Sequence, residues 1–236
     1  MIKLINRLGQ VRILPVTFSV SRIPLEVQVP TQSLYGLDGA VKTGKSTIPP
    51  RQLILQGTVI TDNKQDTRQE VDSLLPFLMA APLHLYRHHE DTRFLQVYPT
   101  GAPQEWLTWD TEVNLRVPLL ALDPYWYGAK VEESLPAGTT TLEVEGTALA
   151  HPVITTIGSV ETLTVKSLTN GYEIKIVGAG GAVEVDTLDY TVTVGAQSAI
   201  DLANDEWLLY GFELLPGTNQ IQTNTPITMT YRPRWW

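Results

Sequence analysis

Apolar residues recur at every second position along most of the chain. This alternation is typical of β-strands that bury one face, and turn-forming residues such as Asn170 and Gly171 separate the alternating stretches. The pattern predicts a mainly β fold of antiparallel sandwiches. The stretches contain Leu25, Val27 and Val29; Leu53 and Leu55; Val113, Leu115 and Val117; Ile174 and Ile176; and Tyr190, Val192 and Val194.

Residues 67–81 break this alternation, because their apolar residues follow the period of a helix. Val71, Leu74, Leu75, Leu78 and Met79 would form one apolar stripe. Thr67 and Glu70 have the spacing of a capping box, whereas Pro76 removes a backbone donor inside the segment. We expect one bent helix or two short ones.

The charges divide the chain in two. Residues 1–127 contain 12 basic and 12 acidic side chains, and residues 128–236 contain 5 and 13, so the net charge of −8 lies entirely in the second part. The balance changes near residues 122–128, where the helix-bearing part gives way to Thr-, Val- and Gly-rich strands. We therefore predict domains at 1–127 and 128–236, and the acidic second domain disfavours nucleic-acid binding.

The amino-acid composition indicates the class of protein and excludes several kinds of functional site. Hydrophobic residues make up 43% of the chain and charged residues 18%, as in soluble globular proteins. The absence of cysteine excludes disulfides, thiolate zinc sites and cysteine nucleophiles. We expect no signal peptide and no membrane anchor, since no uninterrupted apolar run is long enough.

Residues 39–46, GAVKTGKS, match the phosphate-loop pattern of nucleotide-binding enzymes. A working phosphate loop needs a helix directly after it, but Pro49 and Pro50 prevent a helix there. The chain also lacks the strand and helix alternation of a nucleotide-binding sheet. The segment is therefore interpreted as a loop that leads into a strand over residues 51–59.

Other polar groups could form functional sites, but each can also be explained as part of a turn, a loop or the surface. His84, His88, His89 and Glu90 could form a metal cluster, but the alternation around them favours a hairpin with a polar turn at 88–92. The acid pairs Glu132 with Glu133 and Asp186 with Asp189 could serve glycoside hydrolysis, but their place on the surface of an acidic domain is the simpler explanation. The glycine-rich residues 178–181 are interpreted as a loop between strands. We predict no catalytic residue, no metal and no cofactor.

Aromatic residues gather near the predicted boundary and at the end of the chain. They could stack on sugar rings or pack at a domain junction, and their position favours packing. Tyr125, Trp126 and Tyr127 are the predicted junction aromatics, and the last strand, which ends at Trp235 and Trp236, is expected to dock back on the first domain.

Several segments in succession resemble the distal tail proteins of bacteriophages with long, non-contractile tails. In the first domain these are the loop at 43–45 that leads into residues 50–57, the leucines at 74 and 75, the hairpin to 93–97, the strand at 112–120 and the junction at 121–127. In the second domain they are residues 151–155, 214–221 and 229–235.

This resemblance implies a tail-tube-like first domain, with one helix beside its sandwich, and a galectin-like second sandwich. It implies a structural virion protein at the tail tip, made in the host cytoplasm and not an enzyme. Six copies would form a ring that joins the tail tube protein to tail-tip hub or fibre proteins, and DNA would pass through the central channel without specific binding.

On this interpretation the loop residues have a role in assembly. Lys42 and Lys45 would face acidic groups on a neighbouring subunit, and the full predicted assembly loop comprises Gly39, Val41, Lys42, Thr43, Gly44 and Lys45. The alternative functions are a carbohydrate-binding module that recognises a host glycan during adsorption and the nucleotide-binding enzyme suggested by the loop motif.

Overall fold

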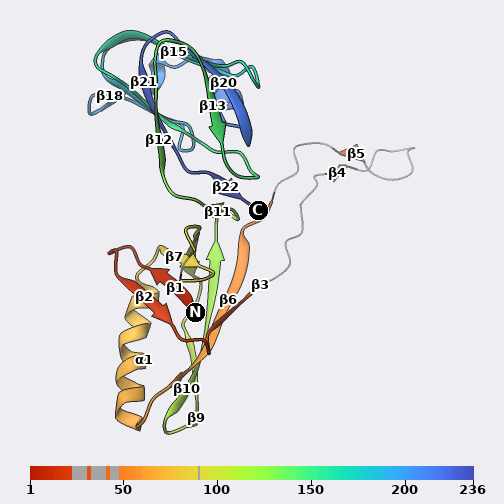
Figure 1. Cartoon of the computed structure of the whole chain (residues 1–236), viewed down its shortest axis with the longest axis vertical. Coiled ribbons are helices and arrows are strands. Elements are labelled where there is room, and N and C mark those ends of the chain that lie inside the picture. The colour runs from red at the N-terminus through yellow and green to blue at the C-terminus, as the bar shows by residue number, and fades with distance from the viewer. Residues whose placement is uncertain (23–30, 33–40, 43–47, 90) are drawn as a thin grey trace. The chain divides into compact units, whose positions relative to one another are not determined.

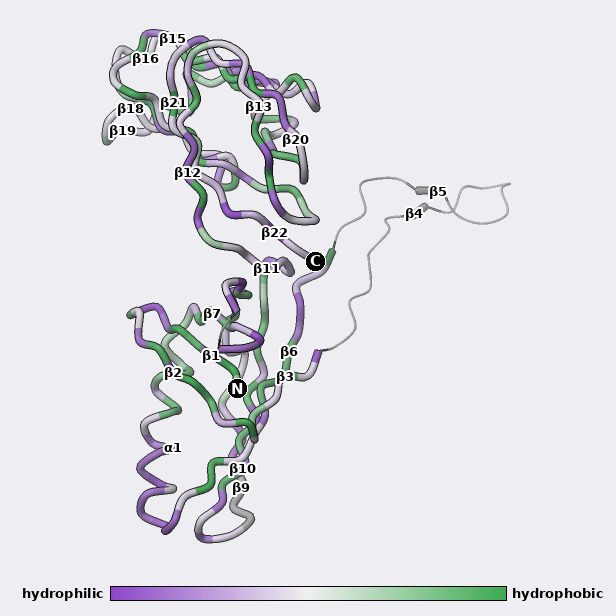
Figure 2. Tube along the Cα trace, in the orientation of Figure 1, coloured by the Kyte–Doolittle hydropathy of each residue, from purple (hydrophilic) through white to green (hydrophobic). Residues whose placement is uncertain are grey.

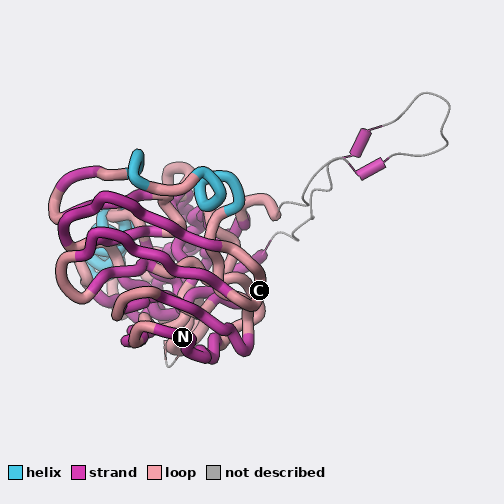
Figure 3. The backbone as a smooth tube through the Cα atoms, turned by 90° about the horizontal axis from the view of Figure 1, so that it is seen from above, coloured by secondary structure: helices cyan, strands magenta, loops and turns pink. Residues whose placement is uncertain are grey.

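The computed structural model describes residues 1–22, 31–32, 41–42, 48–89 and 91–236. The chain forms two compact units, Met1–Trp126 and Tyr127–Trp236. Strands dominate the described part of each unit, and helices accompany them (Figures 1 and 3). The prediction of a mainly β fold is confirmed.

The first unit contains one large antiparallel sheet, in the order β2-β1-β7-β8-β10-β6-β3, with β9 also paired to β10. Its strands are β1 (Ile2–Ile5), β2 (Val11–Leu14), β3 (Ser19–Arg22), β6 (Arg51–Ile60), β7 (Leu83–Tyr86), β8 (Leu95–Pro99), β9 (Gln104–Trp109) and β10 (Glu112–Ala121); the short strands β4 (Thr31–Gln32) and β5 (Val41–Lys42) pair with each other, and β11 (Trp126–Tyr127) spans the boundary between the units.

The sheet is organised around β6 and β10. These strands pair over ten residues, from Arg51 opposite Ala121 to Ile60 opposite Glu112. Their sequences alternate as predicted, so that Leu53 and Leu55 are buried while the neighbouring glutamines are exposed. The predicted strand over 51–59 is confirmed.

The helix α1 (Lys64–Met79) packs against β6 and β10 and buries Val71, Leu74 and Leu78. It begins three residues before the predicted cap, because the Asn63 side chain accepts a hydrogen bond of 2.9 Å from the Asp66 backbone N–H. The capping box at Thr67 and Glu70 is therefore wrong, and Thr67 is buried inside the helix. The two predicted alternatives resolve to one helix that contains Pro76.

The second unit is a sandwich of two antiparallel sheets, ordered β12-β21-β14-β17-β18-β19 and β13-β20-β15-β16. Its elements are β12 (Val131–Leu135), β13 (Gly138–Val144), β14 (Val153–Thr156), β15 (Val160–Ser167), β16 (Glu173–Gly181), β17 (Val183–Asp186), β18 (Thr191–Val194), β19 (Gln197–Ser198), the 3-10 helix η1 (Ile200–Leu202), α2 (Asp205–Tyr210), β20 (Gly217–Thr223), β21 (Ile227–Tyr231) and β22 (Arg234–Trp235).

The inward faces of both sheets supply one hydrophobic core. Ile154 and Met229 come from the first sheet and Val165 and Ile221 from the second, and all four are fully buried. The helix α2, which the strand pattern did not predict, adds the fully buried Trp207. The unit is a sandwich, and its likeness to galectins in particular stays a prediction.

The glycine-rich residues 178–181 are not the predicted loop. They belong to β16, where Gly178 and Gly180 have positive φ angles of 80° and 61° and the register with β15 shifts between Val160 and Thr162. Glycine permits this backbone conformation at low cost, so the strand continues through an irregularity.

The tight contact between Gly57 and Phe18 yields a stability prediction. A Cβ added at Gly57 would lie 2.6 Å from Phe18 Cδ1 and 2.7 Å from Phe18 Cα, closer than van der Waals contact allows. Because Phe18 is buried, Gly57→Ala should lower the free energy of unfolding by about 1–3 kcal/mol in urea titrations. Gly101→Ala is the matched control, since its nearest atom would lie 3.6 Å away. Equal stability of both variants would contradict this view of the packing.

A second prediction concerns Asn219, which is fully buried in the sandwich. Its Oδ1 accepts from Leu215 N at 2.9 Å, and its Nδ2 donates to Leu215 O at 2.7 Å and to Gly217 O at 3.0 Å. Asn219→Ala leaves these backbone groups without the side chain, so thermal or urea unfolding should show a loss of about 2–4 kcal/mol. The exposed Gln222→Ala should change stability by less than about 0.5 kcal/mol.

Candidate assembly surface

The strand β2 lies at one end of the sheet of the first unit. It pairs with β1 through Val11 opposite Ile5 and Leu14 opposite Ile2, and its other side pairs with no strand in the described part of the chain. An edge strand of this kind presents free backbone donors and acceptors to a partner. At the opposite end, β3 pairs with β6 alone among the described strands.

Apolar side chains are exposed on and beside this edge. Val11 is 59% exposed and Ile13 52%, and the flanking Leu8 and Val16 are 68% and 77% exposed. Figure 2 shows that hydrophobic positions continue through β1 and β2. We call Leu8, Val11, Ile13 and Val16 the β2 patch. Soluble proteins seldom leave an apolar edge strand open to water, so the patch is the candidate interaction surface of this unit.

The turn before β2 is held rigidly by Asn6, which is buried. Its Oδ1 accepts from the backbone N–H groups of Leu8 and Gln10, each at 3.0 Å, and its Nδ2 donates to Gln10 Oε1 at 2.8 Å. Gly9 completes the turn with a φ of 74°. Asn6 thus fixes the position of Leu8 and the start of the edge strand.

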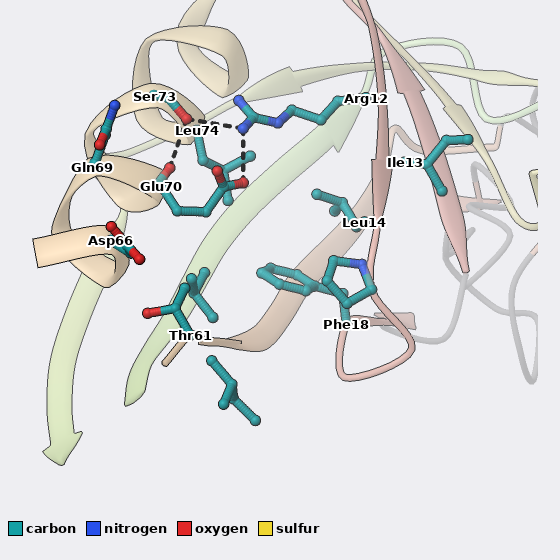
Figure 4. Close-up of a pocket in the computed structure, with 13 residues that line it drawn as sticks. Arg12, Ile13, Leu14, Phe18, Thr61, Asp66, Gln69, Glu70, Ser73 and Leu74 are labelled. Carbon is teal, nitrogen blue, oxygen red and sulfur yellow. Dashed lines mark hydrogen bonds and ion pairs between the residues drawn. The ribbon is translucent and has the colours of Figure 1, made fainter. Parts of the chain in front are cut away.

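A groove of about 510 Å³ lies between β2, the end of β6 and α1 (Figure 4). Arg12 extends from β2 to the helix, where its Nη2 contacts Glu70 Oε1 at 2.7 Å and donates to Ser73 Oγ at 2.9 Å. Thr61, Asp66 and Gln69 supply further polar groups to its wall. The partly exposed ion pair keeps β2 beside α1 and leaves Val11 and Ile13 on the other face of the strand.

A second groove of about 450 Å³ contains cationic side chains. Arg22, Arg87 and Trp126 line it together with the first residues of the chain. The Arg87 guanidinium lies 4.6 Å from the centroid of the Trp126 ring, and the Arg22 guanidinium lies 5.6 Å from it. These distances are those of cation–π contacts.

The predicted assembly loop lies largely outside the described residues. Gly39, Thr43, Gly44 and Lys45 are among those the structure does not describe, whereas Val41 and Lys42 form β5 and pair with β4. After the loop, residues 48–50 lead into β6, so the helix that a phosphate loop requires does not follow it. The role of these residues in assembly stays a prediction.

The predicted junction aromatics have different environments. Trp126 is only 5% exposed and belongs to the first unit, whereas the Tyr127 ring faces the Arg234 guanidinium at 5.6 Å in the second. Tyr125 is half-buried, and its backbone N–H donates to Asp123 Oδ1 at 3.2 Å. Their shared role at a junction stays a prediction.

Several of the histidines and acidic residues considered as metal or catalytic groups make contacts that stabilise the fold. β7 and β8 form the predicted hairpin, and His84 stacks on Phe94 with ring centroids 4.1 Å apart. Asp186 accepts hydrogen bonds from the backbone of Leu188 and Asp189, which form a turn. Among the residues that the structure describes, no group of histidine and acidic side chains has a metal-binding arrangement. None of the described helices has the length and hydrophobicity that crossing a membrane requires.

Sequence reasoning missed the β2 patch and the cationic groove. The sequence of β2, Val-Arg-Ile-Leu, contains a signal for the patch, because apolar residues occupy both faces of a short strand. The groove had no comparable signal, since Arg22, Arg87 and Trp126 are far apart in the sequence.

Most of the second unit matches a known protein family. The family model for the siphovirus-type tail component, C-terminal domain, matches residues 145–235. No curated protein sequence matches the chain.

Solved structures match nearly the whole chain. The crystal structure of the Dit protein of phage SPP1, described as a paradigm of the hub adsorption apparatus in phages infecting Gram-positive bacteria, matches with a TM-score of 0.73 and 17% identity over 100% of both chains. Chains of the phage P2 baseplate in its activated conformation match with TM-scores of 0.54 with calcium and 0.52 with strontium, each at 9% identity. They cover 98% and 97% of this chain and 97% of their own.

At these identities the solved structures establish the fold, and the family model gives the similarity of most of the second unit to a tail component domain. The resemblance seen in the sequence is confirmed. Residues 145–235 match the model of the siphovirus-type tail component, C-terminal domain, and the whole chain has the fold of the SPP1 Dit protein.

Proposed function

We propose that this protein is the hub of a phage tail tip. Six copies form a ring that joins the tail tube protein to the tail-tip hub or fibre proteins, and the ring surrounds the channel through which DNA leaves. The β2 patch carries the proposal, because it is an exposed apolar edge on the unit that would form the ring. The tail component domain and the Dit fold support it.

A ring requires two different surfaces on each copy, since every contact joins one side of a subunit to the other side of the next. Among the strands that the structure describes, the sheet of the first unit ends in two unlike edges, β2 and β3. The β2 patch of one copy would be covered by the next copy around the ring. Burial of apolar area at about 25 cal/mol per Å² would drive the contact.

The charge distribution suits this arrangement. The first unit has as many basic as acidic side chains, so copies can approach closely without net repulsion. The second unit has the whole excess of acidic groups and would keep assembled particles apart in solution. An acidic surface also repels the phosphates of DNA, which favours passage over specific binding.

Electron microscopy and mass photometry of the purified protein should show rings of six copies. Replacing Val11 and Ile13 together by glutamate would place charges in the buried contact, so the affinity between copies should fall about tenfold or more. The monomer should keep its circular dichroism spectrum, because both side chains are exposed in the single chain.

The matched control replaces Ile157 and Val177 by glutamate. These residues of the second unit are 60% and 51% exposed, so the control adds the same charges to a comparable apolar surface. Rings that withstand the change at Val11 and Ile13 would exclude the β2 patch as the contact. A wild-type chain that stays monomeric, with or without tail partners, would exclude the hub.

The predicted assembly loop has its own test. Deletion of residues 41–45 should weaken ring formation or attachment to tail tube protein, because it removes Lys42 and Lys45 as contacts for acidic groups. Unfolding of the monomer should change little. A double change of Lys130 and Lys175 to alanine in the second unit controls for lost positive charge. Normal assembly after the deletion would make the segment a simple linker.

A further inference from the structure

Three arginines of the first unit converge around Trp126. Arg22 ends β3, Arg51 begins β6 and Arg87 follows β7. Arg22 and Arg87 both lie over the Trp126 ring, and each pair among the three arginines is close enough for electrostatic repulsion. We call Arg22, Arg51, Arg87 and Trp126 the arginine pocket.

The three guanidinium groups have no acidic partner among the residues that the structure describes. None of them is paired with a carboxylate of any residue that the structure describes. Arg51 is only 4% exposed, and its buried Nε has no hydrogen-bond partner. Arg12 differs, since it binds Glu70. A buried cation without an ionic partner is costly, and Arg51, which has none among the described residues, lies beside two further cations.

The repulsion affects the protonation equilibria of the cluster. Burial lowers the pKa of Arg22 below its ordinary value, and the charges of Arg87 and Arg51 lower it further. Burial and then Arg87 lower the pKa of Arg51. A bound anion would offset both effects. The planar fork of a guanidinium fits the two oxygens of a carboxylate, and the cation–π contacts with Trp126 hold Arg22 and Arg87 in place.

We propose that the arginine pocket binds a carboxylate side chain from a second copy of this chain. The inference rests on the proposed ring and names an ionic contact in addition to the β2 patch. Each copy has an excess of eight acidic groups, all in residues 128–236, so neighbouring copies offer carboxylates. The groove of about 450 Å³ at Arg22 and Arg87 is large enough to admit a side chain.

Self-association of the full chain tests the contact. The double variant Arg22→Ala with Arg87→Ala should weaken association about tenfold or more in sedimentation or mass photometry. Arg22 and Arg87 are exposed in the single chain, so the variant should fold. The double variant Arg68→Ala with Arg116→Ala removes two exposed arginines elsewhere in the first unit and should associate normally. The self-association of the Arg87→Lys variant should be weaker than that of the wild type and stronger than that of the double variant, because lysine keeps the charge and lacks the planar guanidinium.

Malonate provides a readout that does not need the ring. At matched ionic strength, sodium malonate should raise the melting temperature of the wild-type chain more than sodium chloride does, and this difference should be smaller in the Arg22→Ala, Arg87→Ala variant, which keeps only the general stabilisation by malonate. At higher concentration malonate should also dissociate the ring by competition. Inorganic phosphate serves as the comparison anion and should compete less well.

The outcomes separate the two proposals. Wild-type rings that the double arginine variant weakens, together with malonate competition, would support the contact. Rings that neither the double arginine variant nor malonate weakens would overturn the proposed contact, while the proposal of a ring-forming hub would stand. Malonate or phosphate binding without any effect on association would also overturn it, since the pocket would then hold a free anion. A wild-type chain that stays monomeric would overturn the proposed hub function, and the contact with a carboxylate of a second copy would then be excluded as well.

Discussion

β6 and β10 pair without interruption over ten residues, and the first unit is arranged around this pair. The helix α1 packs against both strands. β3 extends the sheet from β6, and β8 and β9 extend it from β10. The same pairing places Arg51, the first residue of β6, opposite Ala121, which lies five residues before Trp126. A shift of either strand by one residue would turn its apolar residues, Leu53 and Leu55 in β6 or Leu115 and Val117 in β10, away from the core, so the register specifies the unit.

The alternation of apolar residues was sufficient to predict these strands, because burial of one face dominates their sequences. The hairpin at residues 83–97 and the sandwich of the second unit followed from the same signal. The start of α1 could not be predicted in this way. Thr67 and Asn63 both have side chains that can cap a helix, and the packing of Thr67 into the core decides between them. The helix α2 is too short for periodicity to reveal it.

The candidate site was less accessible to sequence reasoning. The exposure of Val11 and Ile13 depends on where β2 lies in the sheet order, which local pattern does not contain. The arginine pocket depends on three strands and a tryptophan brought together from distant parts of the sequence. The family resemblance in the sequence pointed to phage tail components, whereas the proposed contact residues follow from the topology.

The β2 edge has a consequence for the size of the assembly. An open row of copies joined through this edge always leaves one apolar patch in water at its end, however many copies it contains, whereas a closed ring leaves none. Closure therefore gains the free energy of one additional contact without the entropy cost of recruiting another copy. On the proposed function, the angle between neighbouring copies sets the number in the ring, and the exposed edge makes rings with a missing copy unfavourable.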